Sequence, residues 1–79
     1  MAVKQMTFVG LIRWCGSTPT KMKRANVMSI AMIYRINKNG IMYTPIYHIM
    51  DLWEYFKSID CEQKWAYWLE VQKMNRRLK

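Results

Sequence analysis

An Asn-Gly pair, Asn39-Gly40, separates two apolar runs in the middle of the chain. Asn-Gly is typical of a type I′ turn, because both central residues of that turn need a positive φ. Pairing around the turn would place Ile36 opposite Tyr43 and make one face of the hairpin apolar. Since proline cannot donate to a ladder, Pro45 marks the second strand as an edge. The pattern therefore predicts a β-hairpin whose apolar face needs a cover.

The segments on either side complete the predicted fold. The residues from 6 to 15 mix β-branched and aromatic types in partial alternation, which favours a further strand. Asp51 followed by Glu54 is a capping-box pattern and indicates the start of a helix, after which the apolar spacing indicates two helices in succession. We therefore expect an α+β fold, with an antiparallel sheet of about three strands covered on one face by a short helix and a longer C-terminal helix. The strands are expected at about 6–15, 27–37 and 41–49, and the helices at about 52–59 and 61–77.

The length and composition indicate a single domain spanning residues 1–79. Hydrophobic residues make up 52% of the chain and aromatic residues 14%, which excludes a disordered protein. A chain of this length supplies only a marginal core, and large aromatic side chains enlarge it.

The charges are unevenly distributed along the chain. Residues 1–50 carry seven Lys and Arg and no Asp or Glu, whereas all five acids lie in the last 29 positions. A net charge of +8 favours polyanionic partners, although a generally basic, soluble surface is the ordinary alternative. Helix starts favour acid and explain part of the segregation. A solvated loop, however, would accept glutamate as readily as lysine. We therefore expect the acid-free part of the chain to contact a negatively charged partner.

The sequence shows no arrangement of residues that is typical of the common kinds of catalysis. His48 is the single histidine, and no spacing pairs it with a nucleophile and an orienting group. There is no glycine-rich phosphate loop, no HExxH and no calcium loop. Cys15 and Cys61 match no metal-ligand spacing, and two thiols with one histidine cannot complete a zinc site. We expect no enzymatic activity, no cofactor, no metal and no small-molecule substrate.

The cellular setting expected from the sequence is the cytoplasm, that of the host cell if the protein is phage-encoded. The start of the chain does not resemble a signal peptide, and no apolar run approaches the length of a membrane span. A basic helix on a membrane surface is disfavoured by Glu62 and Glu70. Two free thiols are the default in such a setting, with a Cys15–Cys61 disulfide as an alternative that the fold does not require.

Two surfaces are candidates for binding. The first is the set of basic residues in the acid-free part, which would neutralise the phosphates of a nucleic acid or contact an acidic protein. They are Arg13, Lys21, Lys23, Arg24, Arg35 and Lys38. The second is the C-terminal helix, whose aromatic and basic side chains resemble protein-interaction anchors. They are Trp65, Trp68, Lys73, Arg76 and Arg77.

These features predict a small, basic, non-catalytic protein that contacts nucleic acid or a nucleoprotein complex. The alternative is an inhibitor or adaptor of the phage or mobile-element type, which occludes a host protein through aromatic and Arg/Lys contacts. Homodimerisation through a surplus apolar helix face is a further expectation. RRM, KH and zinc-finger signatures are all missing, so the sequence does not separate DNA, RNA and protein targets.

Overall fold

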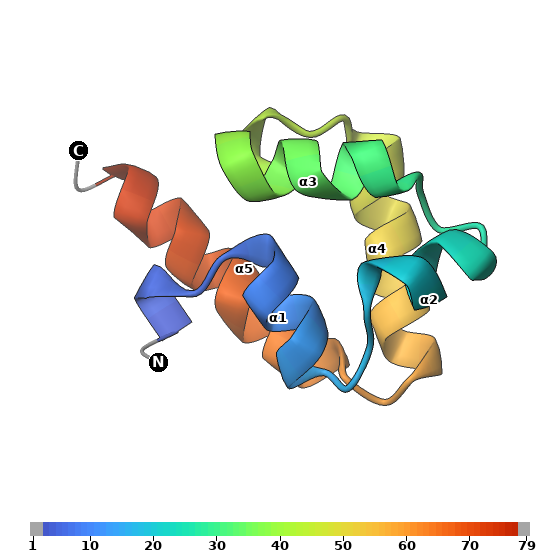
Figure 1. Ribbon diagram of the computed structural model, residues 1–79. Coiled ribbons are helices and arrows are strands. Elements are labelled where there is room, and N and C mark those ends of the chain that lie inside the picture. The colour runs from blue at the N-terminus through green and yellow to red at the C-terminus, as the bar shows by residue number, and fades with distance from the viewer. Residues whose placement is uncertain (1–2, 78–79) are drawn as a thin grey trace.

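The computed structural model describes residues 3–77, and its regular elements are all helical (Figure 1). In chain order they are the 3₁₀ turn η1 (Val3–Gln5), α1 (Phe8–Trp14), α2 (Pro19–Arg24), α3 (Ile30–Asn39), the 3₁₀ turn η2 (Ile41–Tyr43), α4 (Ile46–Ser58) and α5 (Glu62–Arg77). No strand occurs between residues 3 and 77, so the prediction of an α+β fold with a three-stranded sheet is wrong.

Hydroxyl side chains start the first three helices. Thr7, Thr18 and Ser29 precede α1, α2 and α3, and each hydroxyl oxygen accepts a hydrogen bond of 3.1 Å from the backbone N–H three residues on. These bonds satisfy amides that have no partner inside the helix. The segments expected as strands at 6–15 and 27–37 therefore contain helix starts, and local capping overrides their partial alternation.

The Asn-Gly pair ends a helix and forms no hairpin. Asn39 is the last residue of α3, and Gly40 follows it with a φ of +94°, a conformation that glycine adopts at little cost. The N–H of Gly40 donates to the carbonyl oxygen of Ile36 at 2.8 Å. Pro45 then precedes α4, where its missing N–H costs nothing. The third expected strand, 41–49, is η2 and the first turn of α4.

The two helices expected after residue 50 have counterparts with different bounds. The first, expected at 52–59, is α4 and begins at Ile46, so Asp51 lies inside the helix and does not cap it. A turn with a φ of +56° at Asp60 separates α4 from α5. The second, expected at 61–77, is α5 and begins at Glu62.

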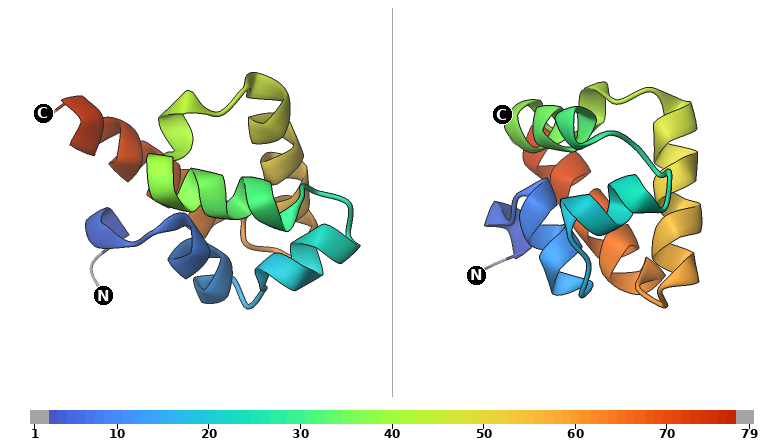
Figure 2. Two further views of the ribbon diagram at one scale, coloured as in Figure 1. Left: turned by 45° about the horizontal axis from the view of Figure 1, so that its top comes forward. Right: turned by 45° about the vertical axis from the view of Figure 1, so that its right-hand side comes forward.

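The core is formed by the inner faces of all five α-helices, and Trp65 of α5 is fully buried in it. Its ring stacks on Phe56 at 5.1 Å and on Trp68 at 6.0 Å between centroids, and Trp53 meets it edge-on at 5.9 Å. Aromatic pairs of this kind stabilise a small core beyond the area that they bury. Trp68 also donates from its indole N–H to the carbonyl oxygen of Met6 at 2.9 Å. The N-terminal turn η1 contacts α5, as the ribbon views show (Figure 2).

A disulfide between Cys15 and Cys61 joins the end of α1 to the start of α5, with a Cα–Cα distance of 5.7 Å. The two cysteines are 46 positions apart, and from the sequence alone this pairing is only an alternative to free thiols. Beside the disulfide, the Lys64 ammonium donates to the carbonyl oxygen of Trp14 and lies 5.0 Å from the centre of its ring. Among the residues described, no helix has the length and apolar character needed to span a bilayer.

Candidate functional site

The pair α2 and α3 is joined by a tight turn, residues 25–29. Asn26 lies in this turn with a φ of +58°, a conformation that asparagine tolerates better than most residues. The buried side chains of Met22 in α2 and Met28 in the turn pack into the core. The N–H of Val27 donates back to the carbonyl oxygen of Met22 at 3.1 Å. The turn is therefore held on α2 by packing and by a backbone hydrogen bond, and α2 contacts α3 directly.

α3 has one buried side and one solvent side. Ile33 and Ile36 face the core and are almost completely buried. Four residues with the spacing i, i+3, i+4 and i+7 are exposed and share the opposite face of the helix. They are Ala31, Tyr34, Arg35 and Lys38, which we call the α3 stripe. The helix lies at the periphery of the molecule in Figure 1, with α2 next to its N-terminal half.

The exposed cations of these two helices form a basic surface. It consists of Lys21, Lys23 and Arg24 on α2, and of Arg35 and Lys38 on α3. Five of the six basic site residues predicted from the sequence thus lie on two helices that contact each other. The ion pair found within the described part of the chain joins Lys73 and Glu70 on α5, so none of these five cations is paired with a described carboxylate.

The sixth predicted residue, Arg13, lies elsewhere. It is exposed in the last turn of α1, at the end that the disulfide ties to α5, whereas the opposite end of α1 contacts α3. Lys4 was not predicted as a site residue. It lines a hollow of about 270 Å³ together with Lys38, and so extends the basic surface toward η1. Lys4 could have been included from the sequence, because it lies in the acid-free first half of the chain.

The C-terminal set predicted for protein contacts is not a surface cluster. Trp65 and Trp68 are 0% and 2% exposed, so a partner would meet these rings only if the core opened. Lys73 pairs with Glu70 on its own helix. Arg76 and Arg77 belong to the last turn of α5, but their side chains lie outside the described part of the structure.

An apolar groove between α4 and α5 was not predicted from the sequence. It has a volume of about 390 Å³ and is lined by Ile41, Met42, Thr44, Ile46, Ile49, Trp53, Ala66, Leu69, Glu70 and Lys73. Ile46 is 71% exposed, and Met50, one turn further along α4, is 60% exposed. The sequence prediction placed Ile46 in a strand at 41–49 and began the helix at 52, so it did not show that Ile46 and Met50 lie together on an exposed helix face.

The described residues contain no cluster of three or more His, Cys, Asp or Glu side chains that could hold a metal ion. Comparisons of the chain with protein-family models, with curated proteins and with solved structures found no match. The support for the candidate site is therefore its geometry and its charge.

Proposed function

We propose that the protein binds double-stranded DNA through α2 and α3, used as a helix-turn-helix. In this motif the second helix lies in the major groove, and the first crosses the sugar–phosphate backbone. The observation that carries the proposal is the α3 stripe, an exposed helix face without acid, adjoining a short basic helix across a tight turn.

The dimensions of α3 suit this role. Its ten residues span about 15 Å at the rise of an α-helix. A B-form major groove is about 12 Å wide and admits one helix. The major groove of an RNA duplex is too deep and narrow for side chains to read, so the arrangement favours DNA over double-stranded RNA.

In this proposal α2 contributes affinity and α3 contributes sequence specificity. Lys21, Lys23 and Arg24 on α2 carry the charge that phosphates attract, which supplies affinity without sequence preference. Ala31 and Lys38 lie at the two ends of the α3 stripe, one helical heptad apart. A small alanine permits close approach to a thymine methyl group, and a lysine can donate to the acceptors of guanine.

The test begins with selection of a preferred duplex from a random DNA pool by the purified protein. Affinity for that duplex is then measured by fluorescence anisotropy over a range of salt concentrations. We expect Lys38→Ala to weaken binding to the selected duplex severalfold and to reduce the preference for that duplex over an unrelated sequence. The matched control is Lys57→Ala, which removes the same charge from the exposed side of α4 and should leave both quantities unchanged.

Three results would contradict the proposal. One is an absence of duplex binding even at low salt. Another is an equal loss of affinity in the Lys38→Ala and Lys57→Ala variants, since that would reflect total charge and not the position of α3. Preference for single-stranded DNA over the selected duplex would likewise exclude a major-groove mode.

A second candidate function is supported by the apolar groove. Exposed Ile46, Met50 and Trp53 on one side of α4 are of the residue types that anchor protein partners. An inhibitor or adaptor would use this face in place of Trp65 and Trp68. A pull-down from a host lysate distinguishes the two: a partner that survives nuclease and is lost in the Trp53→Ala variant supports protein binding.

A further inference from the structure

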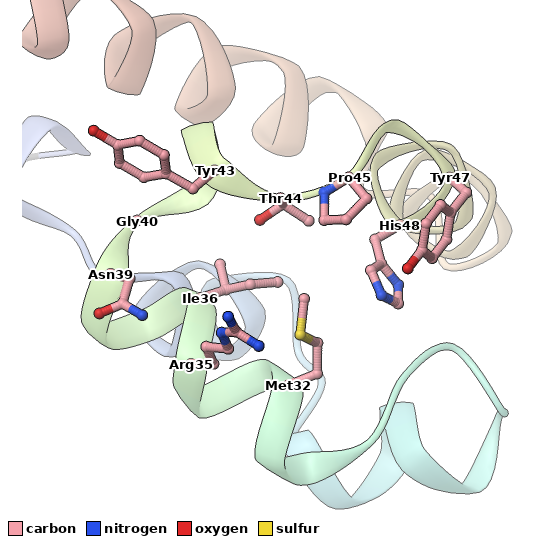
Figure 3. Close-up of a pocket in the computed structure, with 10 residues that line it drawn as sticks. All are labelled: Met32, Arg35, Ile36, Asn39, Gly40, Tyr43, Thr44, Pro45, Tyr47 and His48. Atoms are coloured by element: carbon pink, nitrogen blue, oxygen red, sulfur yellow. The ribbon is translucent and has the colours of Figure 1, made fainter.

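A pocket of about 600 Å³ lies between the C-terminal half of α3 and the start of α4. Figure 3 shows the side chains of Arg35 and Asn39 on α3 at one side of it, and those of Tyr47 and His48 on α4 at the other. Thr44 lies on the connection between them. None of the functions derived above uses this pocket, although Arg35 belongs to both the pocket and the α3 stripe.

The chemistry of the lining favours an anion. The side chains of Arg35, Asn39, Thr44, Tyr47 and His48 can all donate hydrogen bonds, and none of the described carboxylates lines the pocket. The Arg35 guanidinium makes no ion pair with a described carboxylate. A planar guanidinium matches the oxygens of a phosphate by two parallel hydrogen bonds.

His48 supplies an independent observation. Its Nδ1 is shielded from solvent and has no hydrogen-bond partner among the described residues. The ring packs against Tyr47 with 4.4 Å between centroids. A buried polar atom without a partner carries a desolvation cost and often marks a site where something else binds. If the ring turned its Nδ1 toward the pocket, an anion there would supply the missing partner.

We propose that this pocket binds a phosphate group, held by Arg35 and His48, with Asn39 and Thr44 at its sides. The phosphate has two possible sources, the DNA backbone beside α3 and a free phosphorylated molecule. The first source rests on the proposed function, because it requires DNA on α3. The second does not, and the volume is within the range that small-molecule sites occupy.

The first arm of the test uses inorganic phosphate and the free protein. His48 is the single histidine, so its ring resonances in an NMR spectrum are assigned without ambiguity. We expect phosphate, added at constant ionic strength and pH against chloride, to shift these resonances in a saturable manner. Arg35→Gln, a change at an exposed residue that should leave the fold intact, is expected to abolish saturation. Lys57→Ala is expected to preserve it.

The second arm uses the selected duplex with single phosphates replaced by uncharged methylphosphonates. If the backbone fills the pocket, replacement at one position weakens binding by the wild type but not by Arg35→Gln or His48→Ala, which have already lost that contact. A thermal unfolding curve for each variant confirms that it is folded.

The two arms separate the sources and the two proposals. Saturation by free phosphate without such a position in the duplex supports a free phosphorylated ligand, and the reverse result supports the DNA backbone. The absence of both effects in folded wild-type protein overturns the pocket proposal. A protein that binds no duplex but saturates with phosphate contradicts the proposed function and leaves the pocket supported.

Discussion

The side-chain oxygen Oδ1 of Asn37 accepts a hydrogen bond from the backbone N–H of Val9 at 2.9 Å. Val9 lies in the first turn of α1, where amides have no partner within the helix, and Asn37 lies in α3. One side chain therefore completes the start of α1 and fixes α3 against it. Because α3 is the helix that we expect to enter the DNA groove, this bond also helps to hold that helix in place.

Replacing Asn37 with alanine is predicted to lower the free energy of unfolding by about 1–2 kcal/mol, because the partly buried amide of Val9 loses its acceptor. Asn37→Asp retains an oxygen at the same position and should cost less. Urea denaturation of the three proteins measures the difference. Equal stabilities for Asn37→Ala and the wild type would show that the amide finds another partner at no cost.

Tyr34 and Lys23 are predicted to differ in what they contribute to DNA binding. Tyr34 is half exposed on the α3 stripe, so Tyr34→Ala should alter the preferred DNA sequence. Lys23 on α2 is assigned to phosphates, so Lys23→Ala should weaken binding to all sequences alike. Repeating the selection with each variant measures both effects. An unchanged preference for Tyr34→Ala would remove this residue from the base-reading set.

Reduction of the disulfide is predicted to lower the free energy of unfolding by about 2–4 kcal/mol, because the unfolded chain regains the freedom of a long loop. Denaturation with and without a strong reductant tests this, and Cys15→Ala/Cys61→Ala is the control that should not respond to the reductant. Duplex affinity of the folded protein should stay the same, since the bond joins α1 to α5 at the end of α1 away from α3. Loss of affinity without unfolding would contradict that placement.

The apolar groove is predicted to support self-association, the homodimer expected from the sequence. Ile46→Lys places a charge on the most exposed apolar residue of the groove and should shift sedimentation velocity profiles toward the monomer. Tyr67→Lys changes a comparably exposed aromatic residue on α5 outside the groove and should not. A wild type that stays monomeric at high concentration, or an equal response of both variants, would contradict the prediction.

The sequence was a better guide to where the basic residues gather than to the secondary structure of the chain. The segment 30–39 reads equally well with a period of two, through Ile30, Met32, Tyr34 and Ile36, or with a helical period through Ile33 and Ile36. The Asn-Gly signal favoured the first reading. Gly40, however, provides a positive φ that a helix end needs as much as a hairpin does, and tertiary packing decides between the two.

The sequence also contains local signals for helix starts, which are less distinctive than the Asn-Gly pair. Thr7, Thr18 and Ser29 each start a helix, and Pro19 follows a cap at the first helical position, where proline is common. The excess of Lys and Arg in the first half is visible in the sequence, and five of the six basic site residues predicted from it lie on α2 and α3. The pocket and the groove bring together residues from separate elements, so only the three-dimensional fold could reveal them.

The stacked indoles of Trp65 and Trp68 give the molecule an optical signature. Their rings lie 6.0 Å apart with an interplanar angle of 25°, and both are buried in the core. Chromophores at this separation couple their electronic transitions, and circular dichroism then shows a paired band of opposite signs. A compact state that kept its helices but lost fixed packing would lose this couplet while retaining the far-ultraviolet signal of the helices. The core thus carries its own spectroscopic reporter of native order, with no label attached.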